Sequence, residues 1–303
     1  MPELPLDQVR TLLAVVDEGT LDAAAARLHV TPSAVSQRLK ALEQRVGQVL
    51  LLRTKPVRLT DGGRVVVRFA RQLAALERDL HVQLGSAGDA GGARLPIAVN
   101  SDSLATWFLP ALAAVPVELG ICFELHREDQ DHTERLLREG LVMAAVTSSP
   151  EPVAGCSVRP LGRMRYLPVA SPDYVERWLS GWPEVPLRQL LPDVPVVTFD
   201  RHDDLQDGFV RAISAGRPAS ARRHAVPASE SFVDAVVAGL GWGMVPRAQA
   251  EPRLRAGRLV DLDPRHPIDV PLFWQQWKLD SPALAATADA VAAAAARELL
   301  SAR

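Results

Sequence analysis

Hydroxyl and carboxyl side chains gather where short apolar segments end and helical patterns begin. These positions are Ser101, Asp102, Ser103, Glu128, Asp129, Thr147, Asp203, Asp204, Ser229 and Glu230. Clustered carboxylates repel one another unless a cation or protons join them, and a helix N-terminus attracts a carboxylate. A ligand with one carboxylate and one or two cationic groups satisfies both conditions, with its carboxylate at Ser101 and Ser103. Lysine and arginine have this form, whereas an aromatic acid or a sugar phosphate suits such a site poorly.

A second polar cluster lies on one face of a helix predicted over residues 32–46. Val35, Leu39, Leu42 and Val46 form the apolar stripe of this helix, and the opposite face carries Ser33, Ser36, Gln37, Lys40 and Gln44. Glutamine forms paired hydrogen bonds with adenine, and lysine or arginine reaches guanine or phosphate. An isolated polar stripe is more often an ordinary solvated face, so the neighbouring elements decide its meaning.

Those neighbouring elements favour DNA binding. Two shorter helical patterns come first and are separated by Gly19-Thr20. Thr31-Pro32 then opens the third helix, with threonine as N-cap and proline at the first helical position. Residues 53–58, Arg-Thr-Lys-Pro-Val-Arg, follow as a basic segment typical of a β-wing. Residues 1–60 are therefore predicted to form an N-terminal all-α winged helix-turn-helix DNA-binding domain.

A helical pattern over residues 61–84 follows and is predicted to be a linker and dimerisation helix. Val66, Phe69, Leu73, Leu76 and Leu80 repeat at steps of three and four, which is an apolar seam about two heptads long. A helix packed on its own domain would show the same seam, but polar residues cover the remaining faces and favour pairing with a second copy. Glycines in residues 85–92 predict a hinge.

From residue 93 the pattern alternates between strands and helices, which predicts α/β architecture. A first βαβαβ unit is followed by a second, from about residue 161 to 264, with a strand predicted over 166–170. The chain then returns through residues 270–277 to an alanine-rich helix that begins at Pro282. We therefore expect an effector-binding domain over residues 93–303 that resembles a periplasmic binding protein, with lobe I at about 93–160 and 271–303 and lobe II at about 161–270. The predicted crossover segments lie near 161–170 and 265–272.

The acidic and hydroxyl residues introduced first follow these strands, so they should converge on the cleft between the lobes. Taken singly, each is better explained as a helix N-cap. Their convergence on one crevice is what favours a ligand site.

Charge and composition exclude several classes of protein. Residues 1–84 hold 12 Lys/Arg against 9 Asp/Glu, and the remaining 219 hold 22 against 27, so a mildly basic segment precedes an acidic one. No apolar run approaches the roughly 18–20 residues of a membrane span, the start of the chain does not resemble a signal peptide, and Cys122 and Cys156 are the only cysteines. We expect a cytoplasmic protein without membrane association.

Enzyme motifs are absent from the sequence. There is no G-x-S-x-G, HExxH or CxxC, and Gly239-Leu-Gly-Trp-Gly243 has the reverse order of a dinucleotide loop. His126 and His132 flank acidic residues, but their spacing matches no closed zinc signature. No catalytic activity, metal or cofactor is expected.

Residues 29–63, HVTPSAVSQRLKALEQRVGQVLLLRTKPVRLTDGG, resemble the helix-turn-helix and wing of LysR-type transcriptional regulators. This resemblance implies that a double-stranded DNA operator is a partner, and that the chain forms a homodimer or homotetramer. By the same resemblance, Pro32, Ser33, Ser36 and Gln37 read bases from a helix capped by Thr31, and Arg38, Lys40 and Arg53 contact the backbone or minor groove.

Further segments, VNSDSLATWFLPAL, REDQDHTERLLREG, DDLQDGF and SESF, are similar to the branch of that family that senses lysine or arginine and controls basic amino-acid export. By this resemblance, the expected effector contacts are Asp102, Ser103, Glu128, Asp129, Asp203, Asp204, Ser229 and Glu230. Two alternatives stay open: a small-molecule-binding protein whose helical end binds another protein, and a LysR-type regulator that responds to a different metabolite.

Overall fold

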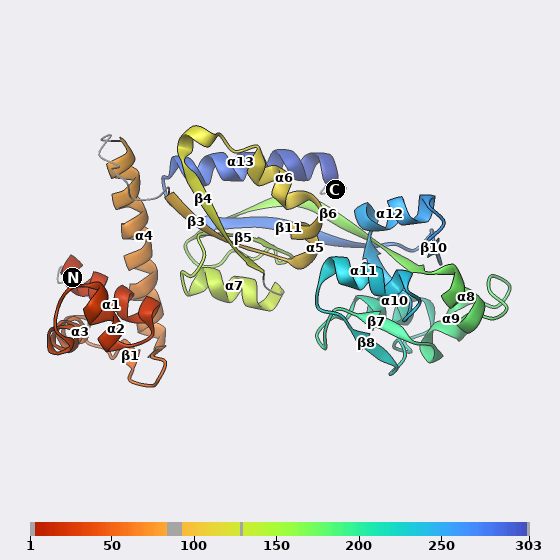
Figure 1. Ribbon diagram of the computed structural model, residues 1–303, viewed down its shortest axis with the longest axis horizontal. Helices are drawn as coiled ribbons and strands as arrows, with labels where there is room; N and C mark the ends of the chain where they lie inside the picture. The colour runs from red at the N-terminus through yellow and green to blue at the C-terminus, as the bar shows by residue number, and fades with distance from the viewer. Residues whose placement is uncertain (1–3, 84–92, 128–129, 302–303) are drawn as a thin grey trace.

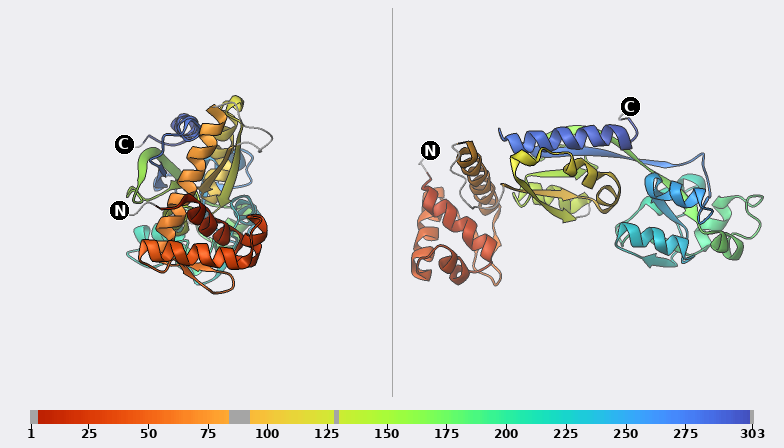
Figure 2. Two further views of the ribbon diagram at one scale, coloured as in Figure 1. Left: turned by 90° about the vertical axis from the view of Figure 1, so that its left-hand side faces the viewer. Right: turned by 45° about the horizontal axis from the view of Figure 1, so that its top comes forward.

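The computed structural model describes residues 4–83, 93–127 and 130–301. An N-terminal helical unit, a long helix and two lobes follow one another along the longest axis of the molecule (Figure 1). The two further views show the same order (Figure 2). The predicted fold, a winged helix-turn-helix followed by a two-lobed α/β domain, is confirmed. In the described part of the chain, no helix combines the length and the apolar character that crossing a membrane requires.

The N-terminal unit consists of three helices and a two-stranded wing: α1 (Leu6–Glu18), α2 (Leu21–Arg27), α3 (Pro32–Val46), β1 (Leu51–Leu52) and β2 (Arg58–Leu59). Gly19 ends α1 in the left-handed region, with φ of 74°, where glycine is favoured. The Thr20 and Thr31 hydroxyls accept hydrogen bonds from the N–H groups of Ala23 and Ala34, each at 3.2 Å. These caps begin α2 and α3 where the sequence predicts. The helices share a small apolar core of Val9, Leu12, Val15, Val35, Leu39 and Leu42.

Helix α4 (Asp61–Gln83) leaves this unit and carries the predicted apolar seam. Phe69, Leu76 and Leu80 are 42%, 43% and 53% exposed. Such exposure is expected of an apolar face that pairs with a second copy of the chain. The prediction is wrong for Val66, which is buried in the N-terminal core, because the first turns of α4 pack against α1. Val65, which the prediction omitted, is 70% exposed and extends the seam instead.

Residues 85–92, predicted to form a hinge, lie outside the described residues. Lobe I begins after them with β3 (Ala93–Val99), α5 (Ser101–Ser103), a π-helical turn (Leu104–Phe108), α6 (Leu109–Ala113), a 3₁₀ turn (Val117–Leu119), β4 (Ile121–Arg127), α7 (Gln130–Arg138) and β5 (Ala144–Thr147). Strand β3 pairs in parallel with both β4 and β5, as the alternating pattern predicts. The C-terminal helix α13 (Pro282–Glu298) returns to this lobe and packs against α6. Together α6 and α13 cover one face of the sheet, and α7 covers the other (Figure 1).

Two long strands run between the lobes, β6 (Cys156–Ala170) and β11 (Ile268–Trp277). They pair antiparallel from Cys156–Trp277 to Tyr166–Ile268. The crossover predicted near 161–170 lies within β6, and the one predicted near 265–272 overlaps only the start of β11. The order of the main sheet is β10-β6-β11-β5-β3-β4, with β9 also paired to β6. β6 begins ten residues before the strand predicted over 166–170. The prediction missed this first part because arginines and a glycine interrupt its apolar pattern.

Lobe II packs its helices around the far ends of these strands. Its elements are α8 (Pro172–Trp178), α9 (Leu187–Leu190), a 3₁₀ turn (Leu191–Asp193), β7 (Val196–Thr198), α10 (Leu205–Ile213), β8 (Arg223–Ala225), α11 (Ser229–Val237), β9 (Gly243–Pro246), α12 (Arg247–Arg255) and β10 (Val260–Asp261). Phe209 and Trp242 pack in its core with ring centroids 5.8 Å apart. The sequence prediction omits β8 and α12, because β8 is exposed throughout and α12 lacks a continuous apolar stripe.

Candidate functional site

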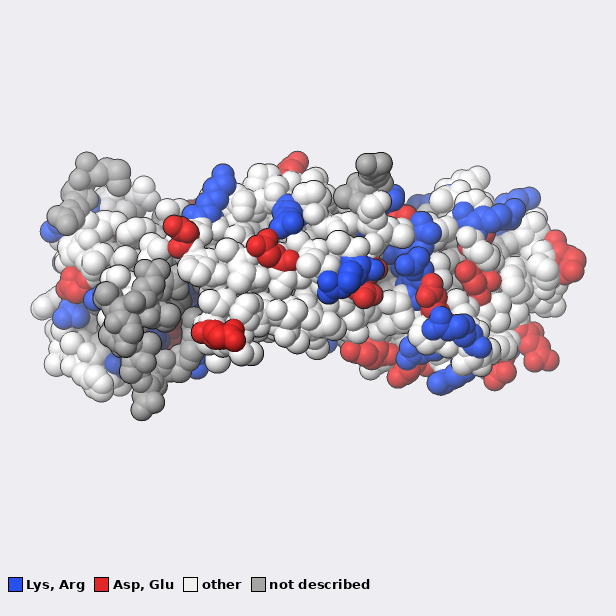
Figure 3. Space-filling view, turned by 90° about the horizontal axis from the view of Figure 1, so that it is seen from above, with Lys and Arg blue, Asp and Glu red and all other residues white. Residues whose placement is uncertain are grey.

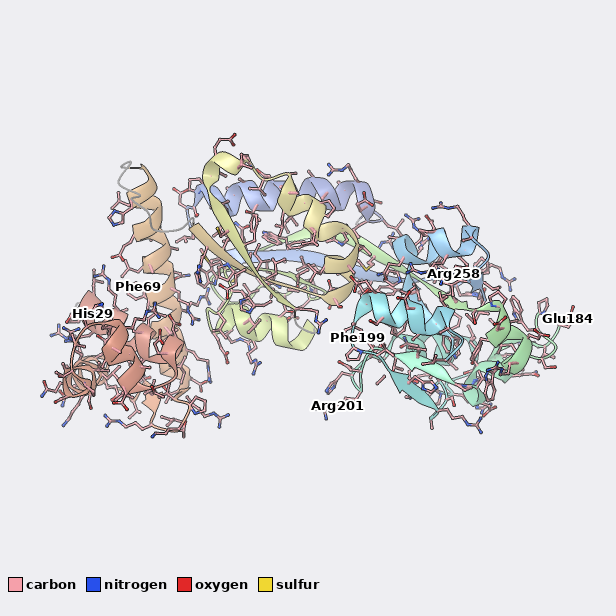
Figure 4. All side chains as sticks on the ribbon, viewed as in Figure 1. His29, Phe69, Glu184, Phe199, Arg201 and Arg258 are labelled. Atoms are coloured by element: carbon pink, nitrogen blue, oxygen red, sulfur yellow. The ribbon has the colours of Figure 1, made fainter. Side chains whose placement is uncertain are left out.

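A cleft of about 600 Å³ lies where the two lobes meet the crossing strands. Lobe I contributes the start of α5, and lobe II contributes the loop after β7 and the start of α11. The full lining is Asn100, Ser101, Asp102, Ser148, Tyr166, Phe199, Asp200, His202, Asp203, Asp204, Leu205, Ser229, Phe232, Met244, Pro246, Val270 and Pro271. Figure 4 shows Phe199 and Arg201 on the side of lobe II that faces lobe I. The cleft therefore combines both lobes and both crossing strands.

Asp102 is the centre of the hydrogen-bond network in this cleft. Its Oδ2 accepts a hydrogen bond of 2.7 Å from the Tyr166 hydroxyl, and its Oδ1 accepts one of 2.7 Å from the Ser229 hydroxyl. The Ser229 N–H in turn donates to the Ser101 hydroxyl oxygen at 3.3 Å. Since Asp102 and Ser101 belong to lobe I and Ser229 to lobe II, these hydrogen bonds join the two lobes directly beside the crossing strands.

The cleft disfavours negative charge on its own carboxyl groups. Burial raises the pKa of Asp102, and the neighbouring charge of Glu230 raises it further, although the hydrogen bonds from Ser229 and Tyr166 oppose this. Burial is also the main cause that raises the pKa of Asp203 and that raises the pKa of Tyr166 well above its usual value. A bound cation would relieve this penalty, because it replaces the lost solvation of the carboxylates.

A second carboxylate, Asp203, is held in place by backbone groups of its own loop. Its Oδ2 accepts from the Phe199 N–H at 2.7 Å, and its Oδ1 accepts from the Leu205 N–H at 3.2 Å. Asp203 therefore closes the loop between β7 and α10 and orients Phe199 and Asp204 along the cleft wall. Among the described residues that line the cleft there is no lysine or arginine. The described wall thus contains Asp102, Asp200, Asp203 and Asp204 together with one histidine, His202.

Charges elsewhere on the molecule are more evenly mixed. Basic and acidic side chains are interspersed on the face seen from above, mainly over lobe II (Figure 3). Many of the basic groups are engaged in ion pairs, such as Arg165 with Asp269 at 2.8 Å and Arg223 with Asp207 at 2.7 Å. The described cleft lining, which has four aspartates and no lysine or arginine, therefore differs from this outer face.

The structure brings together about half of the residues that the sequence marks as effector contacts. Ser101, Asp102, Asp203, Asp204 and Ser229 line the cleft. The others are placed differently: Ser103 is fully buried, the buried Thr147 hydroxyl donates to the Ser149 carbonyl at 3.1 Å, and the exposed Glu230 lies close enough to act on Asp102 without lining the cleft. Glu128 and Asp129 lie outside the described residues.

Sequence reasoning missed the apolar and aromatic part of the lining. Tyr166, Phe199, Phe232 and Met244 all border the cleft. Tyr166 lies inside a crossing strand, and its only signal in the sequence is a polar hydroxyl within an otherwise apolar strand. Phe199 and Phe232 lie close in the sequence to Asp203 and Ser229. They could have been found by including the aromatic residue nearest in sequence to each predicted polar motif.

The N-terminal unit presents the predicted DNA-reading side chains on its surface. Thr31, Pro32, Ser33, Gln37 and Lys40 are exposed at the start of α3 and along one side of it. Ser36 and Arg38 are half-buried, and Arg38 lies 3.9 Å from Asp7 of α1. The exposed face is continuous and polar, as groove recognition requires.

The wing is fixed to this helix by specific contacts. One carboxylate oxygen of Glu43, in α3, accepts hydrogen bonds from the N–H groups of Leu50 and Leu51 at 2.9 and 3.3 Å. Arg53 at the start of the wing loop reaches the Ser36 hydroxyl oxygen at 3.5 Å. The exposed cations Lys55 and Arg58 then extend the basic surface beyond α3. Hydrogen bonds therefore hold the wing against α3.

Fold and site together define a winged helix-turn-helix unit joined to a two-lobed ligand-binding domain. Comparison with known proteins agrees with this: residues 6–64 match the bacterial regulatory helix-turn-helix protein, lysR family, and residues 88–296 match the LysR substrate binding domain. The chain belongs to the LysR family.

Individual relatives extend over nearly the whole chain. The HTH-type transcriptional regulator LysG of Mycobacterium tuberculosis is 49% identical over 297 residues, covering 97% of this chain and 94% of the relative. The lysine export transcriptional regulatory protein LysG of Corynebacterium glutamicum is 42% identical over 288 residues, covering 95% and 97%. The solved structure of full-length LysG from Corynebacterium glutamicum with bound effector Arg has a TM-score of 0.82 at 42% identity, covering 98% and 99%.

Proposed function

We propose that this protein is a DNA-binding transcriptional regulator that senses a basic amino acid, lysine or arginine, and controls the gene of an amino-acid exporter. The observation that carries the proposal is the lining of the cleft: Asp102, Asp203 and Asp204 face it, and its described lining includes no lysine or arginine. One relative supports the same reading in two ways, since LysG of Corynebacterium glutamicum is named for lysine export and was solved with bound effector Arg.

The contacts of the ligand follow from the charges. We place the ammonium or guanidinium of the side chain against Asp203 and Asp204, and the α-ammonium near Asp102. The α-carboxylate would lie at Ser101, at the beginning of α5, where backbone N–H groups and the helix dipole favour an anion. Ser103 and Thr147 would support the cleft wall from behind. A ligand in this position touches both lobes, so it would stabilise one arrangement of them over others.

DNA recognition is assigned to α3 and the wing. Gln37, Ser33 and Ser36 would read base edges in the major groove, with Thr31 and Pro32 fixing the start of the helix. Arg38, Lys40 and Arg53 would contact phosphates or the minor groove. We assign residues 1–60 to this domain, 61–84 to the linker and 85–92 to the hinge, and we expect the exposed stripe of α4 to pair with a second copy.

Titration calorimetry with the twenty amino acids on the full chain tests the proposal. Lysine or arginine should bind, and neutral aromatic or branched amino acids should not. Binding to a DNA duplex, selected by the protein from a random pool, is then measured with and without the amino acid. Binding of an aromatic or branched amino acid in place of lysine and arginine would overturn the assignment of the effector.

A further inference from the structure

Helix α4 contacts lobe I of its own chain through one face, formed by Arg68, Arg71 and Ala75, which we name the docking face. The Arg68 guanidinium lies 3.9 Å from Cys156 Sγ at the start of β6. Arg71 donates to the Glu139 carbonyl at 3.5 Å, just beyond the C-terminus of α7, where a cation is favoured. Ala75 is 4% exposed and belongs to the same buried cluster as the core of lobe I.

Lobe I is shaped to receive this face. A Cβ on Gly140 would lie 2.9 Å from the Arg68 Cα, and a Cβ on Gly155 would lie 2.5 Å from an Arg68 guanidinium nitrogen. Both glycines have positive φ, 70° and 75°, so side chains there are disfavoured by the backbone as well as by the space. The two glycines therefore leave a hollow on lobe I that the Arg68 side chain fills.

The docking face is separate from the other surfaces of α4. Val66, Val67 and Ala70 pack into the N-terminal unit, whereas the exposed apolar stripe contains Val65, Phe69, Leu76 and Leu80. At about 100° per residue, the docking face lies roughly 120° around the helix from the middle of the exposed stripe. Pairing of α4 with a second copy therefore leaves the docking face free to engage lobe I.

Arg71 joins three parts of the molecule at one side chain. Besides the Glu139 carbonyl of lobe I, its guanidinium donates to Asp17 of α1 at 3.0 Å, and its side chain is 18% exposed. A displacement of lobe I relative to α4 would therefore break the Arg71–Glu139 contact of a side chain whose other contact, to Asp17, holds α1. This places an effector-domain contact directly on the DNA-binding unit.

We propose that the docking face is the contact by which the effector domain sets the orientation of the DNA-binding unit, and that Arg68 and Arg71 are positioning residues for the response to the ligand. The part that concerns the response rests on the proposed function; the part that concerns orientation does not. Ligand-driven movement of the lobes then reaches α3 through this packed contact.

The orientation is measured by the distance between two spin labels. One label is attached to the native Cys122, which is exposed on lobe I, and the other to a Val49→Cys substitution, at a position 60% exposed on the N-terminal unit. Cys156 is kept in every variant, because it is only 3% exposed and contacts Arg68, and labelled chains are diluted with unlabelled protein so that distances within one chain dominate. Arg68→Ala combined with Arg71→Ala should broaden the distance distribution relative to the parent. An unchanged distribution would overturn the docking proposal.

Arg10→Ala is the matched control for that measurement. Arg10, in α1, pairs with Glu77 of α4. Its replacement by alanine removes an arginine contact of the same helix and leaves the contacts to lobe I in place. The control should keep the parental distance distribution. Broadening in the control equal to that of the docking variant would assign the effect to α4 as a whole and contradict the proposal.

The response is measured on the same variants with arginine and a duplex selected from a random pool. The docking variant should bind arginine within about twofold of the parent, since distant sites act independently. Its arginine-dependent change in duplex affinity should fall toward onefold from the roughly 5- to 150-fold range of allosteric couplings. A full arginine response in the variant would overturn the proposal. If the parent itself ignores arginine, the proposed function fails, and the distance measurement still decides whether the docking face holds the DNA-binding unit.

Discussion

The Ser229 hydroxyl donates a hydrogen bond of 2.7 Å to Asp102 Oδ1, and the two residues come from opposite lobes, 127 positions apart in the chain. Each lies at the N-terminal end of a helix, α11 for Ser229 and α5 for Asp102. The same carboxylate also accepts from Tyr166 on a crossing strand. One carboxyl group therefore ties both lobes to the strands between them at the point where we place the ligand.

Loss of this contact should loosen the lobes. In Ser229→Ala, Asp102 keeps only its bond to Tyr166, so the arrangement that binds the ligand is less populated. We expect the dissociation constant for arginine or lysine to rise roughly tenfold, which corresponds to about 1.4 kcal/mol, near the lower end of the range for a hydrogen bond to a charged group. Calorimetry measures this change. Ser231→Ala, at an exposed position on the same helix, should leave the constant unchanged; an equal loss in both variants would contradict the role of Ser229.

Asp102→Asn should separate stability from ligand binding. Because the folded pKa of Asp102 is raised, its contribution to stability is fully present below its ordinary value of 3.8 and is lost as the pH rises through the folded pKa. The neutral amide avoids this loss. Its oxygen can accept from Tyr166, and its N–H can donate to the Ser229 oxygen. The Ser229 hydroxyl can then donate to Gln249 Oε1, which lies 3.2 Å away. The melting temperature of the variant should exceed that of the parent at pH 7, and the difference should vanish as the pH falls toward 3.8.

The same substitution should weaken binding of a basic amino acid by on the order of 100-fold, because it removes one charge of a desolvated ion pair. Asp173→Asn, an exposed aspartate in lobe II outside the cleft lining, serves as control for both measurements. Asp102→Asn with parental affinity for arginine would show that the ligand does not use this carboxylate.

Gln37 and Lys40 should contribute differently to DNA binding. Gln37→Ala removes a reader of base edges and should reduce discrimination between the selected duplex and random DNA by about 1–3 kcal/mol. Lys40→Ala should weaken binding to all sequences and lower the salt slope by about one. Fluorescence anisotropy over a range of salt concentrations measures both quantities. Equal losses on selected and random DNA for both variants would contradict the assigned roles.

Glu43 should affect DNA binding without touching DNA. In Glu43→Ala the Leu50 and Leu51 N–H groups lose their shared acceptor, so the wing should detach from α3. We expect a loss of about 1–3 kcal/mol in the stability of the N-terminal unit and weaker binding to every duplex. Glu43→Gln keeps an acceptor oxygen and should restore most of both. Thermal unfolding followed by circular dichroism, together with anisotropy, distinguishes this outcome from a charge effect, in which the glutamine variant would behave like the alanine variant.

Local chemistry made the N-terminal unit predictable. Gly19, Thr20 and Thr31 act on backbone groups within four residues of themselves, so their roles can be read from the order of the residues alone. The periodicity of α3 likewise separates its buried stripe from its exposed polar face. In the effector domain, the same reasoning identified Ser101, Asp102, Asp203, Asp204 and Ser229, because each begins or closely precedes a helix.

Contacts between distant parts of the chain required the tertiary structure. Asp102 meets Tyr166 across 64 positions and Ser229 across 127, and Arg68 meets Cys156 across 88. No periodicity or cap relates such residues, because their proximity is set by the pairing of β6 with β11 and by the packing of the lobes. For the same reason Ser103 and Thr147, which share the local pattern of Ser101, turned out to be buried. The order of the residues therefore specifies which side chains begin each helix, whereas long-range packing decides which of them share a cleft.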